Sequence, residues 1–189
     1  MNPPEFLKRD ISLAPLTTLD VGGEAEYFGE LRDPAMAVAA VSWAKKNGLK
    51  CRILGGGSNV VVADRGLTGV TLKLVSKGWA VRRRRHDAVD ITVSAGENWH
   101  KFVSWTVDED LAGVECLAGI PGAVGAVPIQ NVGAYGQDAA QVIRGVEVLD
   151  FETLQCRWLN TEACCFGYRD SIFKGNSSTQ MVVRVTFRL

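Results

Sequence analysis

The sequence of 189 residues predicts an α+β fold, on three observations. Short apolar or alternating runs of strand length recur along the chain. Two segments combine helical spacing of apolar residues with capping or stop residues. Two long glycine-rich loops interrupt the regular elements. A strand-rich chain with two or three helices fits the α+β class.

The first helix is expected over residues 34–46. Asp33 is a suitable N-cap, Pro34 fits the first helical position, and Asn47-Gly48 supplies the stop. A strand over 50–54 then leads into the first glycine-rich loop, Leu54-Gly55-Gly56-Gly57-Ser58-Asn59-Val60. The β-branched run 60–63 follows, so the order reads strand, loop, strand.

Further strands are expected over 69–74 and 90–95, with residues 82–87 at a hairpin tip between them. Residues 98–110 carry apolar side chains at 99, 102, 103 and 107, which is helical spacing, and Gly113 is the expected stop. The last strands are expected over 145–150, 156–159 and 181–189.

Composition argues against a nucleic-acid or membrane partner. Lys plus Arg and Asp plus Glu are both 21, so the net charge is zero and gives no long-range attraction to an anionic partner. The basic run 82–86 fits a solvated hairpin. No apolar stretch approaches the roughly 20 residues that span a bilayer, and no signal peptide is visible at the N-terminus.

The cysteines favour a reducing compartment. Their number is odd, five, and their spacing is neither that of metal ligands nor that of a redox pair. We therefore expect buried reduced thiols, no metal site and a cytoplasmic location.

The first glycine-rich loop has two interpretations. It does not open a helix, as the dinucleotide-binding fingerprint of a Rossmann fold requires, and it lacks the Gly-Lys-Ser/Thr of a Walker phosphate loop. A backbone cradle for a ligand, with Ser58 and Asn59 as polar donors, is one interpretation. A tight hairpin turn that needs positive φ is the other.

The second glycine-rich loop runs over residues 118–136 and contains no charged residue. A loop of this length inside a compact domain is usually functional. Its amides are open to a ligand, Gln130 and Asn131 offer side-chain hydrogen bonds, and Tyr135 can stack on a ring or pack. Two such loops indicate a ligand with more than one phosphate, and a dinucleotide cofactor is the natural candidate.

A third segment, residues 165–174, places Arg, Asp, Ser and Lys between aromatic residues. Arginine recognises carboxylates and phosphates through two parallel hydrogen bonds. An exposed turn with a local Arg–Asp pair is equally compatible with the pattern. The two histidines, His86 and His100, do not complete a Ser-His-Asp set.

Taken together, these segments resemble the FAD-dependent UDP-N-acetylenolpyruvoylglucosamine reductase family of peptidoglycan synthesis. The resemblance covers almost the whole chain. Its matching stretches are Thr17 to Gly23, Ile53 to Val60, Gly96-Glu97-Asn98-Trp99-His100, Gly119 to Gly136, and Cys164 to Phe173 with its Tyr168-Arg169-Asp170-Ser171 motif.

The resemblance implies a two-lobed FAD-binding fold of the vanillyl-alcohol-oxidase (PCMH) type, with lobes at about 1–75 and 76–189. It implies that NADPH donates a hydride through FAD to the enolpyruvyl group of a nucleotide sugar. Arg169 would be catalytic, and Tyr168 and Arg169 would bind substrate. The implied cofactor residues are Leu54, Gly55, Gly56, Gly57, Ser58, Asn59, Val60, Gly119, Ile120, Pro121, Gly122, Gly125, Ala126, Ile129, Gln130, Asn131, Gly133, Ala134, Tyr135 and Gly136.

The sequence departs from the family pattern in one respect. The C-terminal substrate-binding domain of the family, with its proton-donating serine and its supporting glutamate, has no counterpart in these 189 residues. We therefore expect FAD binding with weak or absent reductase activity, and self-association through an apolar face near Tyr135 and Tyr168. The alternative is a non-catalytic flavin-binding module derived from the same family.

Overall fold

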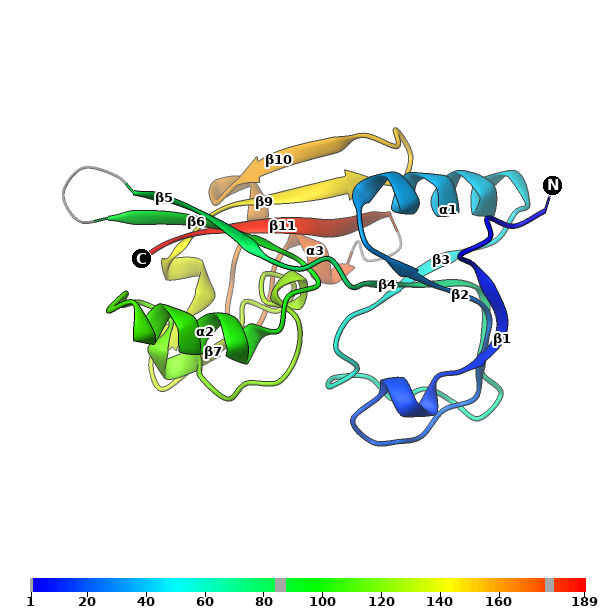
Figure 1. Ribbon diagram of the computed structural model, residues 1–189, viewed down its shortest axis with the longest axis horizontal. Coiled ribbons are helices and arrows are strands. Elements are labelled where there is room, and N and C mark those ends of the chain that lie inside the picture. The colour runs from blue at the N-terminus through cyan, green and yellow to red at the C-terminus, as the bar shows by residue number, and fades with distance from the viewer. Residues whose placement is uncertain (1, 84–87, 176–178) are drawn as a thin grey trace.

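The computed structural model describes residues 2–83, 88–175 and 179–189, and the following account is confined to them. Two β-sheets lie side by side along the long axis of the molecule (Figure 1). The first sheet is built from the N-terminal part of the chain and the second from the remainder. Residues 75–78, between β4 and β5, carry the chain from one sheet to the other.

The first sheet has the strand order β1-β2-β4-β3. Its strands are β1 (Lys8–Ser12), β2 (Glu24–Leu31), β3 (Cys51–Leu54) and β4 (Leu67–Leu74). β1 pairs antiparallel with β2, whereas β2 and β3 both pair parallel with β4. Helix α1 (Pro34–Lys46) connects β2 to β3, and the Asp33 side chain accepts a hydrogen bond from the Met36 amide at 2.9 Å, as its N-cap role predicts.

The second sheet is antiparallel and has the order β10-β9-β11-β6-β5. Its strands are β5 (Trp79–Arg83), β6 (Val89–Ser94), β9 (Ile143–Asp150), β10 (Cys156–Asn160) and β11 (Gln180–Arg188). Helix α2 (Trp99–Asp108) follows β6, and the Asn98 side chain caps its first turn through the Lys101 amide. Asp110, at φ 58°, takes the left-handed conformation just beyond the helix, before the expected stop at Gly113.

The second glycine-rich loop contains only short elements. They are the 3₁₀ turn η3 (Val124–Ala126) and the two-residue strand β7 (Gly133–Ala134), which pairs with β8 (Gln137–Asp138) just beyond the loop. The 3₁₀ turn η4 (Ala139–Gln141) follows β8. The turns η1 (Ala14–Leu16), η2 (Glu115–Leu117) and η5 (Glu162–Cys164) and the one-turn helix α3 (Ile172–Gly175) lie in other connections. The middle of the loop, residues 124–131, is a 3₁₀ turn followed by further turns.

The two sheets share part of their core. Trp99, Phe102 and Phe187 are buried in the cluster that joins α2 to the second sheet. A separate cluster packs α1 and the first sheet against residues of the second sheet: Leu149 in β9, Phe151 directly after it, and Met181 and Val183 in β11. Because one apolar cluster draws on both sheets, burial of that cluster resists their separation.

Most predicted elements are present, and one prediction is wrong. Residues 60–63 form no strand. The Ala63 carbonyl instead accepts hydrogen bonds from the Gly23 and Gly66 amides of neighbouring turns, so it is not available to a strand ladder. Sequence reasoning also missed β1, β2 and β5.

The predicted hairpin tip falls partly on residues 84–87, which lie outside the described residues. The strands on either side do pair antiparallel, with Arg83 opposite Val89. Among the helices of the described residues, none combines the length and the apolar character needed to cross a membrane.

Candidate functional site

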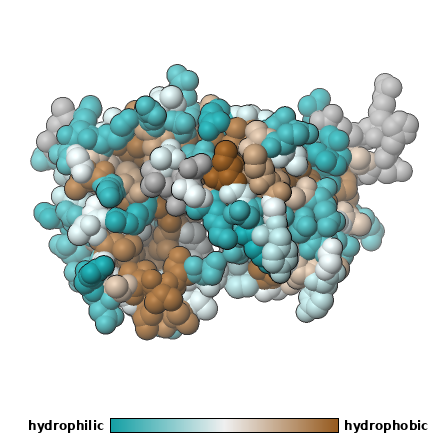
Figure 2. All heavy atoms as spheres, turned by 180° about the vertical axis from the view of Figure 1, so that it is seen from behind, coloured by the Kyte–Doolittle hydropathy of each residue, from teal (hydrophilic) through white to brown (hydrophobic). Residues whose placement is uncertain are grey.

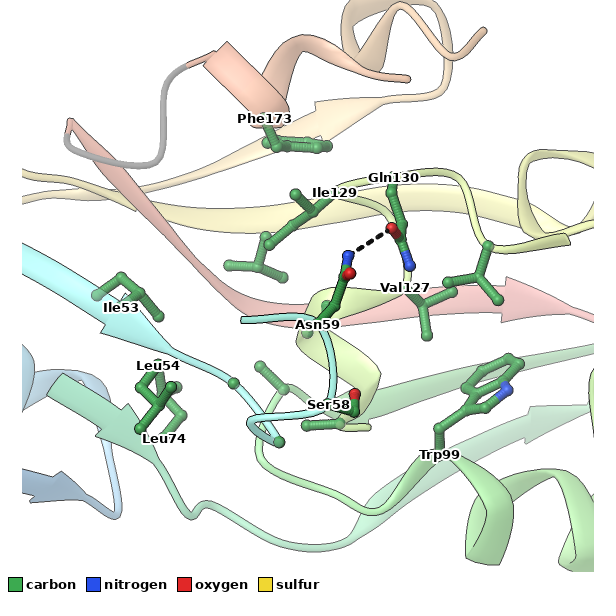
Figure 3. A pocket seen from close by; sticks show the side chains of 18 of the residues that line it. Ile53, Leu54, Ser58, Asn59, Leu74, Trp99, Val127, Ile129, Gln130 and Phe173 are labelled. Carbon is green, nitrogen blue, oxygen red and sulfur yellow. Dashed lines mark hydrogen bonds between the residues drawn. The ribbon is translucent and has the colours of Figure 1, made fainter. Parts of the chain in front are cut away.

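A cavity of about 270 Å³ lies where the two glycine-rich loops meet, between the two sheets (Figure 3). The first loop borders it from the end of β3, and η3 of the second loop borders it from the other side. Apolar side chains from β3, β4, α2 and β11 complete the wall. The lining residues are Ile53 to Val60, Leu74, Ala95, Trp99, Ile120, Pro121, Ala123, Gly125 to Val127, Ile129, Gln130, Val132, Phe173, Lys174 and Gln180 to Val182.

The two loops touch each other through backbone atoms. A Cβ atom on Gly56 would lie 2.8 Å from the Cα of Gly122, closer than real Cβ contacts come. Gly57 has a φ of +74°, and a Cβ there would overlap the Leu16 carbonyl. Both positions therefore need glycine, because the backbone of a neighbouring segment occupies the place of a side chain. The first loop lies between β3 and β4, and these two strands pair parallel, so the loop is not the turn of a hairpin.

Polar side chains tie the loops together. The Ser58 hydroxyl donates to the Pro121 carbonyl at 3.4 Å, and the Asn59 amide donates to the Gln130 side-chain oxygen at 3.1 Å. Figure 3 shows Asn59 and Gln130 reaching toward each other, with Ile53, Leu54 and Leu74 to one side and Trp99 and Val127 to the other. Among the described residues, Lys174 is the one ionisable side chain that lines the cavity.

A second cavity, of about 380 Å³, lies beside the first. It is lined by Asn131, Gly133 to Asp138, Tyr168 and Arg169. The Arg169 guanidinium donates to the carbonyls of Asn131 and Gly133. It also lies over the Tyr168 ring, 5.6 Å from the ring centroid, which is within the roughly 6 Å of a cation–π contact. The short turn that carries Arg169 is closed by mutual hydrogen bonds between Gly167 and Asp170.

Strained backbone is concentrated at this second cavity. Asn131, Tyr135 and Arg169 have φ values of 42°, 52° and 53°. Non-glycine residues adopt this left-handed region at a cost of order 1 kcal/mol or more, and such residues gather at functional sites. Tyr135 and Tyr168 are 91% and 93% exposed, so both rings face solvent at the rim.

One stretch of chain separates the two cavities. Ile129, Gln130 and Val132 line the first cavity, whereas Asn131 and Gly133 line the second. The Ser171 hydroxyl donates to the Ile129 carbonyl at 2.7 Å, and the Asn131 side chain donates to the Gly167 carbonyl at 3.0 Å. The turn that carries Arg169 is therefore fastened to the wall between the cavities.

Comparison with known proteins decides the family. Residues 25–154 match the family model described as FAD binding domain. The chain belongs to this family. The matched region contains both glycine-rich loops, whereas Phe173, Lys174 and Gln180 to Val182 of the cavity lining follow it.

Individual relatives of this FAD-binding domain agree. The UDP-N-acetylenolpyruvoylglucosamine reductase of Streptomyces avermitilis is 41% identical over 95% of the chain, and the match covers 48% of that protein. The FAD-binding domain thus spans about half the length of the curated relatives it matches. The resemblance stated from the sequence is confirmed.

Solved structures show the same architecture. The crystal structure of UDP-N-acetylenolpyruvylglucosamine reductase (MurB) from Thermus caldophilus has a TM-score of 0.75 and 26% identity, over 96% of this chain and 61% of that one. A solvent-stable cholesterol oxidase has a TM-score of 0.68 at 15% identity, over 100% of this chain and 39% of its own, which shows a shared fold. The predicted PCMH-type FAD-binding fold is confirmed.

The cavity between the loops fits the cofactor of the family. A dinucleotide needs a place where its phosphates can approach backbone N–H groups without side chains in between. Gly55, Gly56 and Gly57 border the cavity in succession, so no side chain covers the backbone of this stretch. The apolar walls beyond it suit the flat rings of a flavin cofactor.

The residues predicted for the cofactor divide between the two cavities. Gly119 and Gly122 lie next to the lining of the first cavity: Gly122 contacts Gly56, and the Gly119 amide donates to His100 Nδ1 at 3.1 Å. The others in the first cavity are Leu54 to Val60, Ile120, Pro121, Gly125, Ala126, Ile129 and Gln130. Asn131, Gly133, Ala134, Tyr135 and Gly136 line the second cavity instead, together with Tyr168 and Arg169.

Sequence reasoning missed the walls of the first cavity. Trp99, Met181 and Val182 line it from α2 and β11, far along the chain from either loop. Their apolar character gave no signal that separates a cavity wall from a core. Phe173 and Lys174 follow directly on the Arg169 motif, and this proximity could have indicated them.

Proposed function

We propose that this chain is the FAD-binding part of an NADPH-dependent reductase that converts UDP-N-acetylglucosamine enolpyruvate to UDP-N-acetylmuramate in peptidoglycan synthesis. The observation that carries the proposal is the meeting of two glycine-rich loops, Gly56 against Gly122, at the mouth of an apolar cavity. The names and the extent of similarity of the relatives support the substrate.

The residues of the first cavity would hold FAD. The loops around Gly56 and Gly122 would receive the phosphates, with Ser58, Asn59 and Gln130 as polar partners. Bound FAD would supply hydride transfer, which no amino-acid side chain provides, with NADPH as the hydride donor. The apolar lining would keep water away from the reacting groups.

The residues of the second cavity would receive the nucleotide-sugar substrate. Arg169 is the cation of this cavity, and a guanidinium suits the carboxylate of an enolpyruvyl group. Its hydrogen bonds to the Asn131 and Gly133 carbonyls orient the guanidinium. Tyr168 lies against it, and Tyr135, with its left-handed backbone, lines the same cavity.

A cytoplasmic location accords with this function. The five cysteines are all free in the structure, although two of them, Cys164 and Cys165, are adjacent. The expectation of buried thiols is wrong for Cys156 and Cys165, which are exposed, and holds for Cys51 and Cys164. Free thiols favour a reducing compartment over an oxidising one.

The test measures two steps separately: reduction of the flavin by NADPH and re-oxidation of the flavin by the substrate. The purified chain is desalted after addition of FAD, and we expect a retained two-band flavin spectrum. NADPH is then added without oxygen to bleach the flavin absorbance, and the enolpyruvyl nucleotide sugar is added to restore it. Arg169→Lys should slow the restoration about 100-fold and leave the bleaching unchanged. Arg144→Lys, at an exposed position of β9 that lines neither cavity, serves as the matched control.

Each outcome has a distinct meaning. Loss of all flavin on desalting would contradict the assignment of the first cavity. Retained flavin that neither NADPH bleaches nor the substrate re-oxidises, in the unmodified chain as well as in the variants, would favour the non-catalytic flavin-binding module over a reductase of weak activity. Equal rates for Arg169→Lys and the unmodified chain would contradict the role given to Arg169.

A further inference from the structure

Glu97 is a buried carboxylate that neither cavity uses. Its residue is 2% exposed, in the Gly96-Glu97-Asn98-Trp99 stretch between β6 and α2. One carboxylate oxygen accepts from the Gly78 amide at 2.8 Å and the other from the Asn98 amide at 2.9 Å. Burial alone would raise the pKa of Glu97, but these hydrogen bonds and the charges of Lys77 and Lys101 outweigh it and lower the pKa. The carboxylate is therefore charged and fully paired.

On one side, Glu97 holds the segment that joins the two sheets. Gly78 ends the 75–78 connection between β4 and β5. The Ser94 hydroxyl donates to the Lys77 carbonyl at 3.2 Å, and the Lys77 ammonium lies 3.8 Å from the Glu97 carboxylate. A Cβ on Gly96 would lie 2.7 Å from the Leu74 carbonyl, so the two segments are in close contact.

On the other side, the same stretch holds the second glycine-rich loop. The Val124 amide donates to the Glu97 carbonyl at 2.9 Å, and the Gly125 amide donates to the Ala95 carbonyl at 2.8 Å. The Trp99 amide donates to the Gly122 carbonyl at 3.0 Å. Gly122 is the residue that faces Gly56 of the first loop.

We propose that Glu97 is a positioning residue for the cofactor: it ties the connection between the sheets to the stretch that carries the second glycine-rich loop, and so sets the gap between the two loops. The inference rests on the proposed role of these loops in binding FAD. A buried carboxylate with both oxygens bonded to backbone amides suits this task, since a shift of either segment leaves a charged oxygen unpaired.

The test compares Glu97→Gln with the unmodified chain. Glutamine keeps the length of the side chain but places an NH₂ group against a backbone N–H and removes the charge. FAD affinity, titrated well below the unfolding temperature, should fall about tenfold. The visible circular dichroism of the bound flavin should change as well, which a variant that is only less stable would not show.

Asp150→Asn is the matched control. The Asp150 carboxylate also accepts two backbone amides, those of Glu152 and Thr153, both at 2.9 Å, but it lines neither cavity. We expect its FAD affinity and flavin dichroism to match those of the unmodified chain. An equal loss of affinity in both variants would overturn the proposal, as would unchanged affinity and dichroism in Glu97→Gln.

Two further measurements cover the remaining cases. If Glu97→Gln does not fold, Glu97→Asp, which keeps the charge on a shorter side chain, should fold and still weaken FAD binding; native affinity would overturn the proposal. Hydrogen exchange can be measured without the cofactor. In the Glu97 variant that folds, the Val124 and Gly125 amides should exchange about tenfold faster than in the unmodified chain, and the exchange rates of the β9 and β11 amides should not change. Failure of the unmodified chain to bind FAD would contradict the proposed function alone, and unchanged exchange would overturn the role of Glu97.

Discussion

Gly56 borders the cavity at the point where the two glycine-rich loops touch. A Cβ there would contact the Cα of Gly122 at 2.8 Å and its carbonyl carbon at 3.3 Å, and both are backbone atoms that cannot rotate away. Any side chain at this position must therefore push the two glycine-rich loops apart. This separation would weaken the binding of a ligand that contacts both loops.

We predict that Gly56→Val abolishes FAD retention on a desalting column, because the branched side chain separates the loops. Gly167→Ala is the control: its new Cβ would have the Asp170 Cβ at 3.7 Å as its nearest neighbour, an ordinary contact. Flavin content per mole of protein after desalting is the measurement. Equal flavin content in Gly56→Val and the control would mean that the loops do not hold the cofactor together.

At the scale of the element, helices α1 and α2 both begin with a side-chain N-cap, so the effects of the two caps can be compared. Asp33 and Asn98 each accept one amide of the first helical turn, at 2.9 and 2.8 Å. Removal of either cap should lower the free energy of unfolding by about 1 kcal/mol. The two helices differ in their surroundings, since the Trp99 amide at the start of α2 is bonded to Gly122 of the second loop.

We therefore predict that Asp33→Ala and Asn98→Ala destabilise the protein to a similar extent but differ in FAD binding. Asp33→Ala should keep the native affinity, whereas Asn98→Ala should weaken it at least about threefold, since stability at the start of α2 and binding at Gly122 are coupled. Urea unfolding and fluorescence titration of FAD give the two quantities. The same affinity in both variants would show that the start of α2 does not support the loop.

Elements with local signals could be predicted from the sequence. The Asp33-Pro34 start and the Asn47-Gly48 end mark α1 within a few residues, and the apolar spacing from Trp99 marks α2. Strand β2 carries three glutamates, Glu24, Glu26 and Glu30, so its composition is poor for a strand. Its place in the sheet comes from pairing with β1 and β4, which no local pattern shows.

Site residues could also be predicted from the sequence where they lie in one continuous stretch of chain. Both glycine-rich loops are continuous in sequence, so their residues could be named before their positions were known. The split of the second loop between two cavities could not, because it depends on the Arg169 turn that bonds to Asn131 and Gly133 from 36 or more residues away. Val60 to Ala63 misled the prediction, since β-branched composition alone does not supply a neighbouring strand.

At the scale of the whole molecule, several apolar side chains lie together on the surface and are exposed to solvent. Figure 2 shows hydrophobic side chains grouped at the lower left of that face. Leu19, Val21, Val60 and Val61 are 58%, 43%, 40% and 77% exposed. Their two loops are neighbours, because the Thr18 amide donates to the Gly57 carbonyl. This second exposed group adds to Tyr135 and Tyr168, near which the sequence predicted an apolar face.

Apolar groups of this kind on a soluble monomer mark contact surfaces. We predict that the chain self-associates as its concentration rises and that Val61→Lys weakens this association at least about tenfold, or 1.4 kcal/mol, because a charge would have to be buried in the contact. Val107→Lys is the control, since Val107 is also exposed, at 50%, but stands on α2. Sedimentation equilibrium over a range of concentrations measures both. A monomer at every concentration would contradict self-association, and an equal effect of the two variants would place the contact elsewhere than on the loops of Leu19 and Val61.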